Sequence, residues 1–489
     1  MVQGTGSDVG KSLIVTGLAR AFTRRGLKIL PFKPQNMSNN AGVAADGGEI
    51  GRAQMLQARA CGLPAGVHMN PVLLKPQSDR TSQIIVQGRV LGSSSARDYR
   101  GLAGTLMAPV MESFRHLEAT ADLVLVEGAG SPAEINLRDG DIANMGFAVE
   151  AEVPVVLVGD IDRGGVIASI VGTMALLDDD ERRLVRACCI NRFRGDVSLF
   201  DPAIDIIRRH AGIDCLGVIP YLAAARRLPA EDAVALDHRR PRNDRSAAAI
   251  RVACLRFDRI ANFDDLDPLM SEPDVDVRMI GPGEPLPGNC DLVVLPGSKS
   301  TLADLVSLRA NGWDVDLAAH VRRGGWIVGL CGGYQMLGCE VADPSGIEGR
   351  PGSEPGLGLL DITTTLAGTK QLAEVRGRDT MTGERIAGYE MHMGVTTGPD
   401  LERPMVELET GPDGAVSNSG RIMGCYMHGL FRSDDFRRSF LERLGSRPAN
   451  GIAFEDEVDQ AIDAVADAIE SSTDIDRWLA IARTRTGNP

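Results

Sequence analysis

The chain has 489 residues, a net charge of −14 and 43% hydrophobic residues, enough apolar material for two or three packed domains. The acidic balance and an aromatic content of 4% disfavour a nucleic-acid-binding protein, which needs basic patches and stacking rings. No apolar run approaches the roughly 20 residues that span a bilayer, and the nine cysteines include no CxxC pair. We therefore expect a cytoplasmic protein without a membrane segment, a disulfide framework or a structural zinc site.

The first motif, GTGSDVGKS, lies between a short predicted strand and a helix predicted over 12–25. A glycine-rich turn before a helix directs backbone N–H groups and partial positive charge at one point, which suits phosphate. Lys11 is expected to reach the outer phosphates and the Ser12 hydroxyl to bind Mg²⁺. The bland alternative is a flexible turn, because one residue more than usual precedes the Gly-Lys pair. The predicted ATP-binding loop comprises Thr5, Gly6, Ser7, Asp8, Val9, Gly10, Lys11 and Ser12.

Apolar runs without polar alternation indicate parallel strands that are buried on both faces. In the amino-terminal half they are residues 28–32, 122–128, 153–160 and 184–190. Ligands of such sheets bind beyond the carboxyl ends of the strands. Glu127 ends the second run and is a candidate Mg²⁺ ligand, with a solvated strand end as the alternative. Asn191 and Arg192 follow the fourth run and are predicted to contact the adenine and a phosphate or carboxylate, respectively.

The stretch over 32–54 is too polar for a core and follows the first predicted strand. It is either an ordinary surface loop or part of a substrate site. We predict Asp46 as a second Mg²⁺ ligand. The predicted substrate contacts are Lys33, Gln35, Asn36, Lys75 and Ser131.

Three motifs of this half resemble the dethiobiotin synthetase type of P-loop fold. They are the phosphate loop with its extra residue, EGAG after the second apolar run, and NRFRGD after the fourth. The resemblance implies a parallel-sheet α/β synthetase domain, which we place at 1–240. It also implies the reaction: ATP phosphorylates a carboxylate or carbamate, and nitrogen attacks the acyl phosphate.

A polar, proline-broken stretch over 237–249 is predicted to link this domain to a second α/β series. Strand-like runs at 250–257, 291–297 and 324–333 define that series, which we place at 250–445. Apolar residues at helical spacing close the chain, so 446–489 is predicted as a helical extension that packs on the rest.

The nucleophile of the second domain is predicted from GLCGGYQMLG, which puts Cys331 on a glycine-rich strand-to-helix turn. Such a nucleophile elbow exposes the side chain at a helix N-terminus, which favours a thiolate. We expect oxyanion donors at Gly332 and Gly297 and a base at His428. The alternatives are a buried structural thiol and a core histidine.

These motifs resemble class I glutamine amidotransferase domains, of flavodoxin-like α/β fold, which release ammonia from glutamine through a Cys–His pair. Many members carry a glutamate two residues after the histidine, where this chain has Leu430. The residue that orients His428 is therefore absent or comes from elsewhere. Glu390 is a candidate, although it and His392 equally suit a substrate or domain contact.

A synthetase half followed by a glutaminase half indicates an ATP-dependent, glutamine-hydrolysing amide ligase. The motifs over roughly 1–445 together resemble the cobyric acid synthase family of vitamin B12 biosynthesis; they include PFKPQNMSNN, ADGGEIGRAQ, NPVLLKPQSD and YMHGLF. The resemblance implies ATP, Mg²⁺ and glutamine, and a corrinoid substrate, (adenosyl)cobyrinic acid a,c-diamide, amidated on its b, d, e and g carboxylates. A homodimer is a possible assembly, and ammonia needs a shielded route between the halves.

Three rival hypotheses remain. A cobyrinic acid a,c-diamide synthase has two similar halves, but a different phosphate loop and different residues after the first strand. A partitioning-type P-loop ATPase would explain only residues 1–240 and would leave Cys331 without a role. A non-catalytic scaffold is disfavoured because Lys11, Glu127, Cys331 and His428 occur together.

Overall fold

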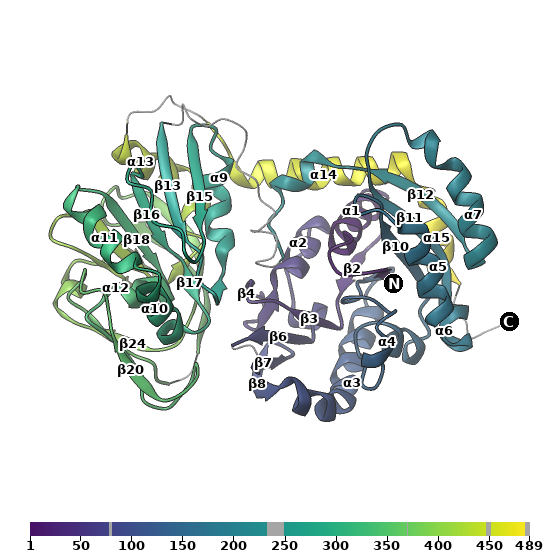
Figure 1. The fold of residues 1–489 in the computed structure, drawn as a ribbon, viewed down its shortest axis with the longest axis horizontal. Coiled ribbons are helices and arrows are strands. Elements are labelled where there is room, and N and C mark those ends of the chain that lie inside the picture. Colours follow the sequence, from purple (N-terminus) through teal and green to yellow (C-terminus); the bar gives the residue numbers. More distant parts are fainter. Residues whose placement is uncertain (78–80, 232–248, 369, 446–450, 485–489) are drawn as a thin grey trace.

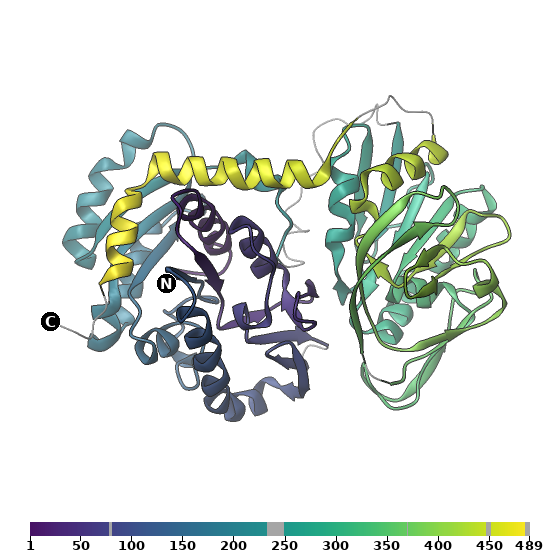
Figure 2. The same ribbon diagram turned by 180° about the vertical axis from the view of Figure 1, so that it is seen from behind.

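The computed structural model describes residues 1–77, 81–231, 249–368, 370–445 and 451–484. Two α/β lobes lie side by side, and the long helix α14 (Phe454–Ser472) runs from the second lobe back across the first (Figures 1 and 2). The predicted linker at 237–249 lies, except for its last residue, outside the described residues. None of the described helices is long and apolar enough to cross a membrane.

The first lobe is built on parallel strands, as the apolar runs predict. Strands β1, β10, β11 and β12 pair in that order, and all pairs are parallel. The parallel pair β2–β9 continues this sheet, because a parallel bridge joins Val2 of β1 to Glu127 just after β9. The bounds are β1 (Val2–Gly4), β2 (Ile29–Phe32), β9 (Leu123–Val126), β10 (Val155–Asp160), β11 (Val185–Phe193) and β12 (Asp214–Pro220).

The polar stretch after β2 forms short strands rather than a plain surface loop. The chain folds into a sheet of order β3-β6-β7-β8 and a hairpin β4–β5, which leads into helix α2. The bounds are β3 (Gln35–Met37), β4 (Ala41–Val43), β5 (Glu49–Gly51), α2 (Arg52–Ala60), β6 (Val72–Pro76), β7 (Thr81–Val86) and β8 (Arg89–Ser95).

Helix α1 (Lys11–Arg24) follows the glycine-rich loop and buries its apolar face, including Ile14 and Leu18, in the core of the first lobe. The predicted carboxyl-terminal helices cover it: α14 packs on α1, and α15 (Ile475–Arg483) follows. At Gly17 a Cβ would come within 2.4 Å of the Ile469 side chain, so the close approach of the two helices requires glycine. The other helices of this lobe are α3 (Ala96–Glu118), α4 (Met145–Glu150), α5 (Val166–Leu176), α6 (Asp179–Leu184) and α7 (Asp201–Ala211).

The second lobe contains a sheet of order β15-β13-β16-β18-β28-β27, parallel except for β27. Its bounds are β13 (Ile250–Leu255), β15 (Val275–Ile280), β16 (Leu292–Leu295), β18 (Trp326–Leu330), β27 (Ala415–Val416) and β28 (Ile422–Cys425). Helix α12 (Gly332–Leu337) follows β18. The remaining helices are α9 (Asp267–Ser271), α10 (Thr301–Ala310), α11 (Trp313–Arg322) and α13 (Asp434–Leu444).

Three smaller sheets complete the second lobe, and all their strand pairs are antiparallel except the parallel pair β19–β21. One has the order β26-β25-β22-β23-β29, another β20-β19-β21-β24, and β14 pairs with β17. Their bounds are β14 (Ile260–Ala261), β17 (Gly297–Ser298), β19 (Glu340–Asp343), β20 (Gly352–Pro355), β21 (Thr363–Thr365), β22 (Gln371–Asp379), β23 (Arg385–His392), β24 (Val395–Thr397), β25 (Val406–Leu408), β26 (Gly411–Asp413) and β29 (Met427–His428).

The lobes meet where β4 faces the second lobe (Figure 1). Tyr389 and Met391 of β23 join a buried cluster with Ala41 and Val43 of β4. Polar contacts flank this cluster, including an ion pair of 2.5 Å between the ammonium of Lys370 and Glu49. The contact therefore brings β23, the strand that lies beside His428, against the synthetase half.

Candidate active sites

The glycine-rich loop lies between β1 and α1, the strand–turn–helix context that phosphate binding requires. The Lys11 ammonium folds over it, donating to the carbonyl oxygens of Gly6 (3.1 Å) and Gly130 (2.9 Å), and burial lowers the pKa of Lys11. Asn191 holds the loop from β11, since its amide nitrogen donates to the Val9 carbonyl oxygen at 2.8 Å. This contact fixes the loop conformation and gives Asn191 a role besides the predicted adenine contact.

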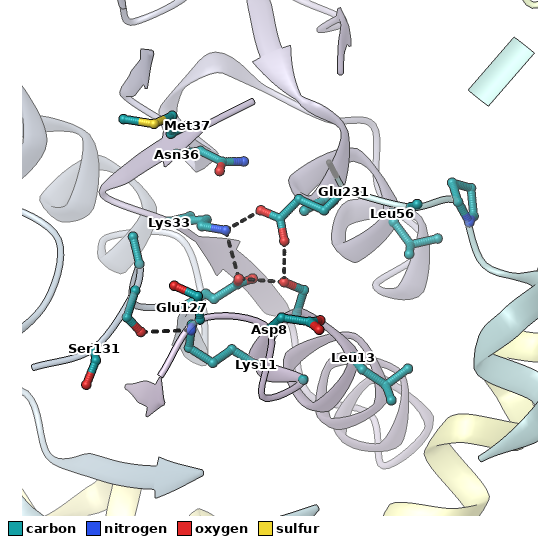
Figure 3. Close-up of a pocket in the computed structure, with 18 of the residues that line it drawn as sticks. Asp8, Lys11, Leu13, Lys33, Asn36, Met37, Leu56, Glu127, Ser131 and Glu231 are labelled. Atoms are coloured by element: carbon teal, nitrogen blue, oxygen red, sulfur yellow. Dashed lines mark hydrogen bonds and ion pairs between the residues drawn. The ribbon is translucent and has the colours of Figure 1, made fainter. Parts of the chain in front are cut away.

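A buried charge cluster adjoins the loop (Figure 3). The Lys33 ammonium lies 2.9 Å from Oε1 of Glu127 and also contacts Glu231. The Ser12 hydroxyl lies 2.6 Å from Oε1 of Glu127 and 2.7 Å from Oε2 of Glu231. Burial opposes the charge on Lys33, but the two carboxylates outweigh it and raise the pKa of Lys33. The cluster thus holds one cation between two anions at the phosphate loop.

This donor set fits Mg²⁺, which prefers oxygen ligands and keeps several positions for water and phosphate. Ser12, Glu127 and Glu231 present a hydroxyl and two carboxylates at one point. Sequence reasoning missed Glu231, because it follows the last strand of the sheet in a polar stretch without a motif. Burial opposes the charged form of Glu231, but Lys33, Ser12 and Lys11 together outweigh burial and lower the pKa of Glu231, which favours the carboxylate.

A cavity of about 2270 Å³ opens from this cluster and is lined by both lobes. The second lobe contributes Arg278 and Glu284, among others. Arg192 lies in the lining and pairs with Asp160 at 2.9 Å and with Asp8 at 3.0 Å. The predicted residues that line this cavity are Ser7, Asp8, Gly10, Lys11, Ser12, Lys33, Gln35, Asn36, Glu127, Ser131, Asn191 and Arg192.

Cys331 stands between β18 and α12 with φ 51° and ψ −108°, a left-handed conformation that costs a side-chain-bearing residue free energy. This is the sharp turn of a nucleophile elbow. The thiol is buried and donates to the Met391 carbonyl oxygen at 3.6 Å. Cys331 is thus held in a strained geometry with its thiol against β23.

His428 has a buried carboxylate as its orienting partner. Its Nδ1 lies 2.7 Å from Oδ2 of Asp265, while Oδ1 of Asp265 accepts from the Gly429 N–H at 2.6 Å. Burial opposes the charged imidazole, but Asp265, assisted by Cys331, raises the pKa of His428 to about 10. Within the described residues Nε2 is buried without a well-formed hydrogen bond, which leaves this nitrogen to serve the thiol.

The candidate Glu390 is not the partner of His428; in the β23–β29 pairing it stands opposite Met427. The orienting residue, Asp265, lies on a 3-10 helix (Phe263–Leu266) far away in sequence. The sequence around it, NFDDLDP, contains no motif that points to His428, because only the fold brings these two distant segments together.

Gly297 and Gly332 both lie at this site, as the oxyanion prediction requires. A Cβ on Gly297 would stand 3.2 Å from Cε1 of His428. A Cβ on Gly332 would stand 2.9 Å from the Ser298 backbone nitrogen. Two backbone segments therefore converge beside Cys331 at positions where only glycine fits.

Comparisons with known proteins agree with this arrangement. A CobQ/CobB/MinD/ParA nucleotide binding domain matches residues 1–235, and a CobB/CobQ-like glutamine amidotransferase domain matches residues 251–436. The protein named cobyric acid synthase from Cereibacter sphaeroides is 57% identical over 483 residues, 99% of each chain. Its namesake from Bradyrhizobium diazoefficiens is 55% identical over 484 residues, again 99% of each chain. The chain belongs to the cobyric acid synthase family.

The predicted fold, a P-loop synthetase half followed by a glutamine amidotransferase half, is thereby confirmed. Among solved structures, PurLQS from Thermotoga maritima aligns with 44% of this chain and 97% of its own, at 17% identity. Its TM-score of 0.30 is too low to support any argument about this family member.

Two of the predicted substrate and metal residues, Asp46 and Lys75, do not line the cavity of this cobyric acid synthase family member, and neither do Thr5, Gly6 and Val9 of the predicted ATP-binding loop. Asp46 lies in the β4–β5 turn, where its Oδ2 accepts a hydrogen bond from the Val67 N–H at 3.0 Å. The second carboxylate at the phosphate loop is that of Glu231. Lys75 is buried at the contact between the lobes, 2.5 Å from Oε1 of Glu49 and 3.7 Å from the Met391 sulfur. Burial, only partly offset by Glu49, lowers the pKa of Lys75 to about 7.

Proposed function

We propose that this protein amidates the b, d, e and g carboxylates of (adenosyl)cobyrinic acid a,c-diamide, using ATP and glutamine. The observation that carries the proposal is the 57% identity, over 99% of the chain, to proteins named cobyric acid synthase. The geometry supports it, because a glutaminase arrangement at Cys331 and a phosphate loop with a lysine between two carboxylates occur in one chain.

In the synthetase half, the loop amides and Lys11 bind the β- and γ-phosphates of ATP. Ser12, Glu127 and Glu231 would hold Mg²⁺, which neutralises phosphate charge when it is bound. Lys33 orients the substrate carboxylate, whose oxygen attacks the γ-phosphorus and displaces ADP. Ammonia then attacks the carbonyl carbon of the acyl phosphate, and loss of inorganic phosphate and a proton leaves the amide.

In the glutaminase half, the Cys331 thiolate attacks the carboxamide carbon of glutamine while His428 carries the proton. The backbone donors near Gly297 and Gly332 bind the developing oxyanion. His428 gives its proton to the leaving nitrogen, which departs as ammonia, and water hydrolyses the thioester to glutamate. Asp265 keeps the imidazole in the orientation that this cycle needs.

The cavity is large enough for a bulky substrate, at about 2270 Å³. Arginines that can exchange partners with substrate carboxylates line it, including Arg138, Arg194 and Arg278, which pair with Glu181, Asp162 and Glu284, respectively. Successive carboxylates require the corrinoid to be released and rebound or to be reoriented in the cavity; we infer release and rebinding, because no internal repeat of the sequence supplies several active sites. A cytoplasmic location and a homodimer stay predictions.

Mass spectrometry of the a,c-diamide incubated with protein, Mg·ATP and glutamine tests the proposal. We expect a ladder of carboxylate-to-amide conversions that ends at four. Consumption of ATP and glutamine without modified corrinoid would keep the amidotransferase and discard the substrate. A rate of ATP hydrolysis that does not change when glutamine is added would favour the partitioning-type ATPase.

A further inference from the structure

One residue of the synthetase half reaches the glutaminase site across the contact between the lobes. Arg52 is the first residue of α2 and is 5% exposed. Its Nη2 lies 2.9 Å from Oδ2 of Asp264 and donates to the Tyr389 hydroxyl at 2.5 Å. Because a buried guanidinium is stable only when its charge is paired, these two contacts fix where α2 meets the second lobe.

Both partners of Arg52 touch the catalytic histidine or its carboxylate. Asp264 directly precedes Asp265, the residue that holds His428 Nδ1. Tyr389 lies opposite His428 in the β23–β29 pairing, and its ring stacks on the imidazole with centroids 5.3 Å apart and planes inclined by 20°. Arg52 therefore contacts the residue next to Asp265 and the ring that stacks on His428, which are the two neighbours through which it can act on the imidazole.

The same helix also contacts the phosphate site. Gln57, five residues after Arg52 in the nine-residue helix α2, donates to Oε2 of Glu127 at 2.5 Å. Five residues of helix span about 7.5 Å and move as one rigid element. Helix α2 thus joins Glu127 of the synthetase site to the Asp264–Asp265 turn of the glutaminase site.

We propose that Arg52 is a positioning residue of the glutaminase, supplied by the synthetase half, which holds His428 in place through Asp264 and Tyr389. The proposal rests on the proposed function only in assigning glutamine hydrolysis to Cys331 and His428. Without Arg52, Asp264 is left as an uncompensated buried charge next to Asp265, and the turn that carries both shifts.

Arg52→Met tests this with glutamate release and with amidation driven by glutamine or by ammonium salts. We expect kcat for glutamate release to fall about 10- to 100-fold with KM for glutamine changed less than threefold. Amidation driven by ammonium should stay within twofold of the wild type. Arg52→Lys, which retains the charge but loses the forked geometry, should recover part of the loss.

Arg59→Met is the matched control, because Arg59 lies on the same helix and its ion pairs are with Glu455 and Asp459 of the carboxyl-terminal region rather than with Asp264. It should leave glutamate release near the wild-type rate. Tyr389→Phe keeps the ring and removes only the hydroxyl. In the double variant with Arg52→Met, the activation free energy of glutamate release should rise by less than the sum of the two single increases, because both substitutions remove the same contact.

An equal loss of glutamine- and ammonium-driven amidation in Arg52→Met would overturn the proposal, as would unchanged glutamate release or an equal effect of Arg59→Met. If Arg52→Met does not fold, Tyr389→Phe decides, since it should lower kcat for glutamate release and spare the ammonium reaction. Glutamate release does not depend on the acid that accepts the ammonia. If the corrinoid is not the substrate, the mass spectra of the wild-type reaction will show no amidation, while the effect of Arg52→Met on glutamate release can still be measured.

Discussion

The two active sites differ in how their charged groups are partnered. In the glutaminase, Cys331 is already in its elbow conformation and Asp265 already orients His428. In the synthetase, the groups suited to ATP and metal neutralise one another, with Lys33 between Glu127 and Glu231. The glutaminase is therefore preorganised for chemistry, whereas the synthetase site has to exchange internal partners for ligands.

This difference predicts where substitutions act. In a preorganised site, removal of one group lowers the rate of the chemical step. In a site that exchanges partners, removal of one group also changes the affinity for nucleotide or metal.

Cys331→Ala should abolish glutamine-driven amidation, by at least about 10³-fold, because no other group supplies the thiolate. Ammonium salts should still support amidation, since the synthetase site is untouched. Assays of both nitrogen sources measure this. The exposed Cys339 offers the control variant, Cys339→Ala, which should behave as the wild type. Loss of both activities in Cys331→Ala would show that the halves are not separable.

Lys11→Ala should stop amidation with either nitrogen source, by about 10²- to 10³-fold, because the outer phosphates lose their cation. Some glutamate release should persist. ADP formation and glutamate release are measured in parallel. Lys28→Ala, which removes an exposed lysine, is the control and should behave as the wild type. Unchanged amidation would remove the assignment of the phosphate loop.

Asp265→Asn should lower kcat for glutamate release by about 10²- to 10⁴-fold, because the amide no longer stabilises the imidazolium and favours the wrong tautomer. It should also lower the pKa of His428, since Asp265 is the group that raises this pKa to about 10. Rates and an NMR titration of the imidazole test both effects. Asp258→Asn, at an exposed position, is the control.

Glu231→Gln should weaken metal-dependent nucleotide binding about 10- to 100-fold and leave glutamate release nearly unchanged. Calorimetric titration of the nucleotide at increasing Mg²⁺ measures it without turnover. Glu134→Gln is the matched control, because Glu134 lines the same cavity, whereas the carboxylates that contact Ser12 and Lys33 are those of Glu127 and Glu231. Equal effects of the two variants would exclude Glu231 from the metal site.

Sequence reasoning worked best where a function depends on consecutive residues. The phosphate loop, the elbow at Cys331 and the apolar strands each depend on neighbours in the chain, and the structure places them as expected. Lys33 and Glu127 were also found, because each follows a strand whose carboxyl end faces the cavity.

Contacts between residues that lie far apart in the chain depend on the tertiary structure and could not be predicted. Asp265 meets His428, Glu231 meets Ser12, and Arg52 meets Asp264, and no local pattern specifies these distances. Asp46 and Lys75 show the converse: their residue types suit a site, but the β4–β5 turn holds Asp46 against Val67, and β6 directs Lys75 to Glu49. The sequence by itself determined the two chemistries through local backbone motifs, while the packing of the lobes decided which side chains complete each site.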